Sequence, residues 1–290
     1  MQVPASGKIC SGVLISRRHV LTAAHCVYDT SKVERKPGEA CDPSVELSPL
    51  YEIYTYIGSK CPKAGPCDAD PHRTVYRADL VLPHPSYDPC TAANDLAIIQ
   101  LDKNVHPADG SPACLAEKHY RVLGPVAAVG YGMDTRPRPD KDNPGLQVVV
   151  LDAVSDDNGK ITTRNKNKTT CFGDSGGPLY KNDGIPRAVV YGIASTSEVN
   201  CSLPYEEAVN YFIDVRKHLG WICDMTGVCP RFGSEYEQFH IAYDRRNREE
   251  VALGINYGYP LPEKERDVSV ITSARIAIPG TWRHFLSPLD

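Results

Sequence analysis

The segment Cys171–Leu179, Cys-Phe-Gly-Asp-Ser-Gly-Gly-Pro-Leu, constrains this chain more than any other. It places one serine, Ser175, among glycines and directly after an aspartate. A serine hydroxyl is a weak nucleophile and needs a neighbouring base to accept its proton. The carbonyl that it attacks also needs backbone N–H donors, and donors so close to a substrate favour glycine. Ser175 is therefore a candidate nucleophile, and the N–H groups of Gly173 and Ser175 are candidate oxyanion donors.

Two further segments supply the groups that such a serine requires. Leu21–Cys26 contains His25, which can act as the base, and Asn94–Ile99 contains Asp95, which can orient that histidine. Catalytic triads occur in several chain orders, and the order His, Asp, Ser is the one found in chymotrypsin. Each residue alone would pass for an ordinary surface, turn or loop residue. All three together, in this order, predict a catalytic triad.

These segments resemble the three catalytic blocks of the chymotrypsin/trypsin family of serine proteases, peptidase family S1. The resemblance covers about residues 8–222. It implies an all-β fold of two Greek-key, six-stranded β-barrels, the first truncated at its N-terminus, followed by a short C-terminal helix. The domain organisation predicted from it is a serine protease domain over residues 1–224 and a C-terminal extension of unassigned role over residues 225–290.

Short hydrophobic runs between turn residues independently favour all-β barrels. Strands are expected at 11–16, 51–57, 96–101, 126–132, 146–151 and 188–194. The segment 214–222 resembles the C-terminal helix of the family, and Asp214 is expected to cap its N-terminus.

Eleven cysteines favour an oxidising compartment, because cytosolic thiols are kept reduced. No Cys-x-x-Cys or His-Glu-x-x-His string is present, so neither a metal nor a cofactor is predicted. The net charge of −4 gives no sign of attraction to nucleic acid or membranes. A secreted, extracellular protein is predicted, although residues 1–8 contain no apolar signal-peptide core, so signal and propeptide are expected to be missing from this sequence.

The cysteines are assigned largely through the resemblance. It implies a bridge between Cys10 and Cys26 and another between Cys171 and Cys201, while proximity in the sequence suggests Cys223 with Cys229. In relatives, a cysteine in a segment like Pro112–Leu115 often bonds a propeptide cysteine, which predicts that Cys114 is free. The remaining four are expected to pair among themselves, and the sequence does not choose among the three pairings of Cys41, Cys61, Cys67 and Cys90.

One departure from the family concerns Asp174. In the family, cleavage frees an apolar N-terminal residue whose amine pairs with the aspartate before the nucleophile, and this sequence contains no such segment. A buried carboxylate without a partner costs several kcal/mol. Two interpretations remain open: the sequence is part of a longer secreted zymogen, or it is a form locked in a zymogen-like state.

A second departure concerns substrate specificity. The resemblance places Thr169 at the floor of the primary pocket, where trypsin-like members carry aspartate. A neutral floor cannot pair with an Arg or Lys side chain, so small or uncharged residues before the scissile bond are favoured; a blocked pocket is the alternative. The other expected substrate-binding residues lie on an edge strand and a pocket wall: Ser195, Thr196, Ser197 and Asn210.

The function predicted from these observations is a serine endopeptidase that works through an acyl-enzyme intermediate and lacks Arg/Lys specificity. Protein or peptide substrates and protein protease inhibitors are the expected partners, and a monomer is expected. The alternative is a non-catalytic or zymogen-locked homologue that acts as a binding or regulatory protein.

Overall fold

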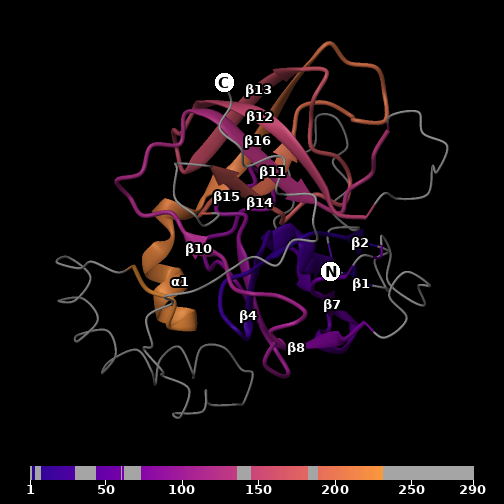
Figure 1. Ribbon diagram of the computed structural model, residues 1–290, viewed down its shortest axis with the longest axis vertical. Coiled ribbons are helices and arrows are strands. Elements are labelled where there is room, and N and C mark those ends of the chain that lie inside the picture. Colours follow the sequence, from indigo (N-terminus) through magenta and orange to yellow (C-terminus); the bar gives the residue numbers. More distant parts are fainter. Residues whose placement is uncertain are drawn as a thin grey trace. The chain divides into compact units, whose positions relative to one another are not determined.

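The computed structural model describes residues 2–3, 8–29, 44–59, 61, 73–135, 145–181 and 189–230. Their strands form two large sheets (Figure 1). The chain divides into two compact units, and the described residues up to Arg216 belong to the first of these, whereas Lys217–Pro230 belong to the second. All candidate site residues except the Cys223–Cys229 pair lie in the first unit.

The N-terminal half forms a seven-stranded sheet with the order β2-β1-β7-β8-β9-β4-β3. Among the described residues this sheet is open, because no pairing joins β2 to β3. A small two-stranded sheet and two 3-10 turns accompany it. The elements are β1 Gln2–Val3, β2 Lys8–Ile9, β3 Val13–Leu14, β4 His19–Thr22, η2 Ala24–Cys26, β5 Tyr28–Asp29, β6 Glu46–Leu47, η3 Leu50–Glu52, β7 Tyr54–Tyr56, β8 Val75–Pro83 and β9 Ala97–Leu101.

The C-terminal half forms a second sheet with the order β10-β15-β14-β11-β12-β13-β16. An additional pairing of β15 with β16 closes it into a barrel of six antiparallel strands, and the short β10 joins β15 in parallel outside the ring. The strands are β10 Cys114–Leu115, β11 Gly124–Gly130, β12 Gln147–Ser155, β13 Lys160–Lys166, β14 Pro178–Lys181, β15 Val189–Ser197 and β16 Glu207–Asp214. This closed barrel, together with the open first sheet, is consistent with the trypsin-like double-barrel fold with a truncated first barrel that was expected from the sequence.

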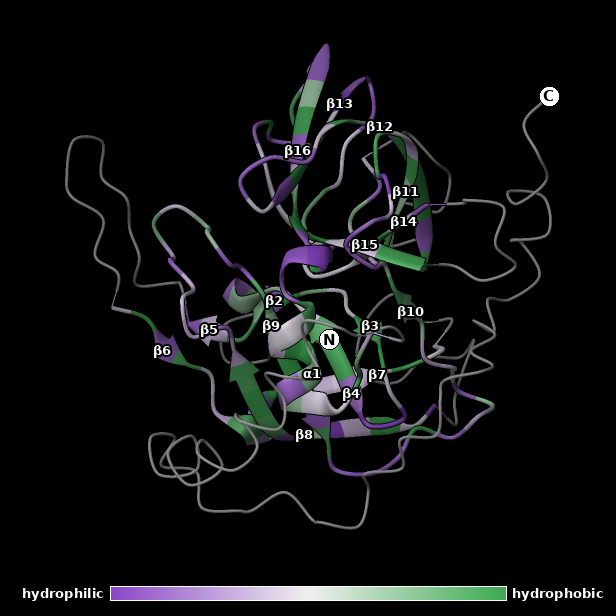
Figure 2. Cartoon of the chain, turned by 90° about the vertical axis from the view of Figure 1, so that its left-hand side faces the viewer, coloured by the Kyte–Doolittle hydropathy of each residue, from purple (hydrophilic) through white to green (hydrophobic). Residues whose placement is uncertain are grey.

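Each sheet surrounds its own hydrophobic core. Ile53, Ile99 and Leu101 belong to the first, and Leu151 and Phe212 to the second. Successive side chains of a strand point to opposite faces. In β12 this produces alternation of buried and exposed positions from residue 150 to 154. Figure 2 shows the hydrophobic residues concentrated along the strands.

The structure corrects the predicted start of the C-terminal helix. β16 continues through Asp214, and α1, Leu219–Thr226, begins after His218, which makes no side-chain capping hydrogen bond. Asp214 is therefore not the N-cap of α1. Its fully buried carboxylate caps the preceding 3-10 turn η4, Val215–Lys217, by accepting the Arg216 backbone N–H at 3.0 Å. It also accepts from Nε and Nη2 of the Arg216 side chain at 2.8 Å, and such charge-assisted bonds are stronger than a cap alone.

Two other expectations differ from the structure in extent. The strand expected at 51–57 is shorter, because residues 50–52 form a 3-10 turn and pairing begins at Tyr54. The strands β13 and β16 are not among those expected from the sequence. They pair continuously from Lys160 with Ile213 to Lys166 with Glu207. Polar and charged residues occupy most of β13, so its hydrophobic pattern is weak, whereas β16 contains the buried apolar residues Ala208, Val209, Phe212 and Ile213.

Candidate active site

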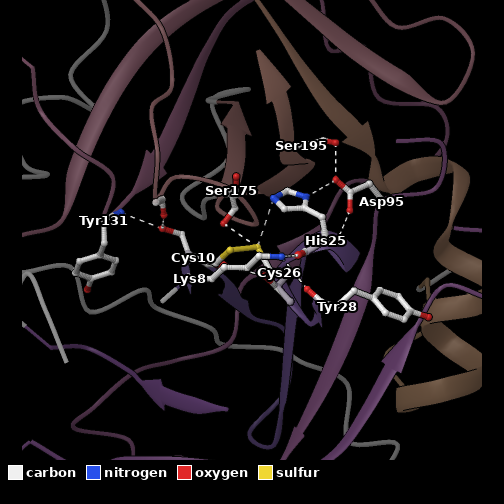
Figure 3. The surroundings of a disulfide bond; sticks show 12 residues. Lys8, Cys10, His25, Cys26, Tyr28, Asp95, Tyr131, Ser175 and Ser195 are labelled. Carbon is white, nitrogen blue, oxygen red and sulfur yellow. Dashed lines mark hydrogen bonds and ion pairs between the residues drawn. A yellow bond between two sulfur atoms is a disulfide. The ribbon is translucent and has the colours of Figure 1, made fainter. Parts of the chain in front are cut away.

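Strand pairing in the first sheet brings His25 and Asp95 together. β4 and β9 are antiparallel, with Thr22 opposite Ala97. The chain just after Thr22 therefore faces the chain just before Ala97. His25 lies on the turn η2 and Asp95 lies two residues before β9. The His25 Nδ1 atom is 2.7 Å from Asp95 Oδ2, and the His25 backbone N–H donates to Asp95 Oδ1 at 2.8 Å (Figure 3).

The turn before β9 fixes the position of Asp95. Asn94 has a left-handed backbone with φ of +51°, which asparagine tolerates better than most residues. Its side chain donates to the Ser86 carbonyl at 2.8 Å. Asp95 itself is completely buried. Burial alone would raise the pKa of Asp95, but the charge of His25 and hydrogen bonds from His25 and Ser195 outweigh it and lower the pKa. The carboxylate is therefore held in its charged form.

Ser195 was expected to line the substrate-binding edge strand, and the structure directs its side chain elsewhere. Its hydroxyl donates to Asp95 Oδ2 at 2.6 Å, and the residue is only 7% exposed (Figure 3). The next residue of β15, Thr196, points to solvent. This contact joins the second sheet to the first. Strand alternation could have predicted a buried Ser195, but no sequence signal identifies Asp95 as its partner.

Ser175 lies in the tight loop before β14. Gly173 and Gly176 have left-handed φ angles of +99° and +80°. A Cβ atom at Gly176 would lie 2.1 Å from Thr22 Oγ1, so a side chain there would collide with the first sheet. Among the described residues, the N–H groups of Gly173 and Ser175 donate to no acceptor. Both predicted oxyanion donors are thus available to a ligand.

The Ser175 hydroxyl makes no hydrogen bond with any described residue, so the predicted bond to His25 is not formed here. His25 Nε2 lies 3.8 Å from Cys26 Sγ (Figure 3). Catalytic hydrogen bonds are often long without substrate and tighten in the complex. The structure therefore brings His25, Asp95 and the Ser175 loop into one region, with the His–Asp bond already made.

Asp174 is held by two backbone donors. Its Oδ1 accepts from Gly132 N–H at 2.8 Å, and its Oδ2 accepts from Cys171 N–H at 2.9 Å. Among the residues described, no cation lies within ion-pair distance of this carboxylate. Desolvation raises the pKa of Asp174, although the hydrogen bonds from Cys171 and Gly132 lower it in part. A partly buried aspartate in this state favours protonation.

The residues predicted for the pocket floor form one hydrogen-bonded cluster. The amide oxygen of buried Asn210 accepts from Thr169 Oγ1 at 2.7 Å, Thr170 Oγ1 at 2.9 Å and Thr170 N–H at 3.1 Å. Thr169 Oγ1 also lies 3.3 Å from Ser197 Oγ. The structure thus brings three of the predicted pocket residues together, while Thr196 is exposed on the neighbouring strand. The cluster is neutral and its polar atoms are largely satisfied.

Three disulfide bonds join the pairs expected from the sequence: Cys10–Cys26, Cys171–Cys201 and Cys223–Cys229. Cys114 is a free, half-buried cysteine, as expected. Cys61 and Cys90 are disulfide-bonded, while Cys41 and Cys67 lie outside the described residues, so the pairing of these four stays a prediction. Cys10, His25 and Cys26 lie close enough together to hold a metal ion, but the two sulfurs are bonded to each other and cannot bind as thiolates.

Lys8 is a site residue that sequence reasoning missed. Its Nζ donates to the carbonyl oxygens of His25 at 3.0 Å and Tyr28 at 2.8 Å (Figure 3). Desolvation lowers the pKa of Lys8, although the charges of Asp29 and Asp95 raise it in part. These two hydrogen bonds thus stabilise the turn that carries His25. A lysine two residues before a cysteine has no pattern that would have revealed this contact.

These features define a class of protein. A double β-barrel with a His–Asp pair facing a glycine-rich serine loop is the arrangement of trypsin-like serine proteases. The sequence profile of the trypsin family, described as "Trypsin", matches residues 1–222. The chain belongs to the trypsin family.

Individual relatives agree with this assignment. CLIP domain-containing serine protease B9 of Anopheles gambiae is 31% identical over 229 residues, covering 73% of this chain and 54% of that protein. Serine protease SSP1 of Scolopendra subspinipes is 29% identical, covering 76% of this chain and 74% of that protein. Kallikrein 1-related peptidase b8 of Mus musculus is also 29% identical, covering 74% of this chain and 79% of that protein. The chain thus spans about half the length of the mosquito protein. Within the described residues, no helix has the length and hydrophobicity needed to span a membrane.

Proposed function

We propose that this chain is a serine endopeptidase that hydrolyses peptide bonds through an acyl-enzyme intermediate. The observation that carries the proposal is the pairing of His25 with Asp95 next to a serine loop in which the Gly173 and Ser175 N–H groups donate to no described residue. Ser175 Oγ attacks the substrate carbonyl while His25 Nε2 accepts its proton. The Gly173 and Ser175 N–H groups stabilise the oxyanion that forms. His25 then protonates the leaving amine, and water releases the acyl group by the same steps in reverse.

Asp95 serves this reaction by orienting His25. Its carboxylate accepts the Nδ1 proton, which leaves the lone pair of Nε2 free for the serine. The backbone bond from His25 N–H and the bond from Ser195 hold both carboxylate oxygens in place. Since the pKa of Asp95 is lowered, the carboxylate remains charged when His25 becomes an imidazolium.

Labelling with a fluorophosphonate tests the proposal, because the reagent reacts with an activated serine. The full-length, proteolytically processed protein is expected to hydrolyse peptides and to take one label. Ser175→Ala is expected to lose both, whereas Ser111→Ala, at a partly exposed serine, should keep both. Unchanged hydrolysis in Ser175→Ala would refute the mechanism.

A second candidate function is favoured by Asp174. Among the described residues no cation lies beside its carboxylate, and a nucleophile loop in this state resembles that of a zymogen rather than an activated protease, as in a zymogen-locked or non-catalytic homologue that acts as a binding protein. Labelling before and after proteolytic processing distinguishes the two. Labelling that appears on processing supports the protease, and none in either form supports the homologue.

For specificity, we propose cleavage after small or medium uncharged residues. The neutral cluster of Thr169, Ser197 and Asn210 offers no charge to an Arg or Lys side chain, and the Asn210 side chain takes up room that glycine would leave open. A peptide library should show little cleavage after Arg or Lys. Thr169→Asp alone should not increase cleavage after Arg or Lys, because the Asn210 amide can turn and donate to the new carboxylate. Thr169→Asp combined with Asn210→Gly should increase it. Arg/Lys cleavage by the unaltered protein would contradict the assignment.

Protein or peptide substrates, protein inhibitors, a monomeric state and secretion are part of this proposal. The disulfides support secretion, since such bonds persist in oxidising compartments. The domain boundary after residue 224 and the role of residues 225–290 also remain proposals.

A further inference from the structure

We propose that Ser11 is a positioning residue for the oxyanion loop, because its hydroxyl holds the Gly173 peptide in place. This inference rests on the proposed protease function, since it assigns a further residue to the same reaction. Ser11 lies outside the three catalytic motifs and directly follows Cys10, whose disulfide partner Cys26 is the neighbour of His25. Ser11 therefore lies between the turn that carries His25 and the loop that carries Ser175, which are the two halves of the candidate site.

The side chain of Ser11 links two backbone segments of the second sheet. Its hydroxyl donates to the Gly173 carbonyl at 2.8 Å and accepts from the Tyr131 N–H at 2.9 Å. A serine hydroxyl has a single proton, and Tyr131 N–H is itself a donor. The proton must therefore point to Gly173. Ser11 is 3% exposed, so water does not compete for these bonds. Figure 3 shows the bond from the Tyr131 nitrogen on the side of the disulfide opposite Asp95.

The backbone of Ser11 is anchored as firmly as its side chain. Its N–H donates to the Ser175 carbonyl at 2.8 Å, and its carbonyl accepts from Thr22 Oγ1 at 2.8 Å. Ser11 thus binds the carbonyl groups on both sides of Asp174, those of Gly173 and Ser175. The bond from Thr22 holds the Ser11 backbone in place, because Thr22 is the last residue of the strand β4.

Gly173 is the residue of this loop that most needs such a tether. A glycine at φ of +99° has no Cβ to restrict its rotation, and its peptide can turn at low cost. The Gly173 N–H belongs to the preceding peptide plane, whose Phe172 carbonyl accepts from the Met133 N–H at 2.9 Å. Ser11 fixes the following plane through the Gly173 carbonyl, so both peptide planes that meet at the Gly173 Cα are held and the N–H cannot turn by rotation about that atom. Oxyanion donors are effective because they are held in position before the reaction. Loss of the tether should therefore slow the chemical step rather than weaken substrate binding.

The kinetic test compares Ser11→Ala with Ser16→Ala in the full-length, processed protein. The Ser16 hydroxyl also makes several hydrogen bonds, to Arg18 and His19, but touches nothing in the nucleophile loop. Because removing an oxyanion donor outright lowers kcat about 10²–10³-fold, loosening one should lower it about tenfold in Ser11→Ala, with KM nearly unchanged. Ser16→Ala should keep kcat, and Ser11→Thr, which retains the hydroxyl, should recover most of it. The affinity of a peptide aldehyde, which needs the oxyanion donors, should fall in parallel with kcat.

A second measurement does not require activity. The backbone amides of Asp174 and Gly177 are hydrogen-bonded within the loop, to Cys171 and Asp174. Their hydrogen exchange should accelerate in Ser11→Ala and not in Ser16→Ala. Wild-type kcat together with wild-type exchange in Ser11→Ala would overturn the inference. If the unaltered protein neither hydrolyses peptides nor reacts with a fluorophosphonate, the proposed function fails, and loop exchange alone then decides whether Ser11 is the tether.

Discussion

The two aspartates of the candidate site, Asp95 and Asp174, differ in how their charge is compensated. Asp95 faces the imidazole of His25 and the hydroxyl of Ser195, and its pKa is lowered despite complete burial. Among the described residues, Asp174 accepts from the backbone N–H groups of Gly132 and Cys171 alone, and desolvation raises its pKa. Both carboxylates accept hydrogen bonds on both oxygens. Within the described part of the chain, the difference therefore lies in the ionisable partner that Asp95 has and Asp174 does not.

This comparison separates two tasks of the site. In the proposed mechanism the region around Asp95 orients His25, and both Asp95 oxygens accept hydrogen bonds from described residues. The region around Asp174 carries the nucleophile loop, and two neutral donors do not offset the desolvation of its carboxylate. A cation beside Asp174 would lower its pKa again.

The largest expected effect concerns Asp95. Asp95→Asn should lower kcat about 10⁴-fold, because an amide can hold the wrong tautomer of His25. Steady-state kinetics of the processed protein measures this. Asp79→Asn is the matched control, since Asp79 forms an exposed ion pair with Arg18 at 3.2 Å and should keep full activity. A loss of less than about tenfold in Asp95→Asn would remove Asp95 from the triad.

A smaller effect is expected on the other side of the comparison, at Gly132. A Cβ there would lie 2.4 Å from the Asp174 Cγ, and the carboxylate is fixed by its hydrogen bonds. Gly132→Ala should therefore destabilise the fold by about 1–3 kcal/mol and slow fluorophosphonate labelling. In the control Gly124→Ala, with φ of +96°, the Cβ meets no atom within 4 Å, so only backbone strain is added. Equal labelling rates in both variants would show that Asp174 does not govern the loop.

The smallest effect is a difference in pH dependence. Asp95 has a lowered pKa, so its stabilising contribution is present above the ordinary value of 3.8 and is lost as pH falls through the folded pKa. Asp174 has a raised pKa, so its contribution is present below 3.8 and is lost as pH rises through the folded pKa.

Urea unfolding at a series of pH values measures these contributions as the difference in unfolding free energy between the unaltered protein and each variant. The unfolding free energy of the unaltered protein minus that of Asp95→Asn should decrease as pH falls. The same difference for Asp174→Asn should decrease as pH rises. Slopes of the same sign would contradict the comparison.

Local sequence determined much of this protein. Motif residues around Ser175, His25 and Asp95 predicted the fold, because tight glycine turns and buried catalytic groups tolerate few residue types. The family resemblance also predicted the bridges of Cys10 and Cys171 correctly. Hydrophobic runs located strands such as β9, since a fully buried strand needs a continuous apolar segment.

Only the tertiary structure decided which side chains meet across the two sheets. Ser195 bonds Asp95, Asn210 bonds Thr169, and Ser11 bonds Gly173, over sequence separations of 100, 41 and 162 residues. Serine and asparagine at these positions would suit many loops and strands, so their identity carries little information about a partner. Asp214 illustrates the same limit, because its local pattern suggested a cap of the C-terminal helix, whereas its carboxylate caps the earlier 3-10 turn and pairs with the Arg216 guanidinium. Hydrogen bonds between distant segments depend on how the sheets pack, and that packing is a property of the whole chain.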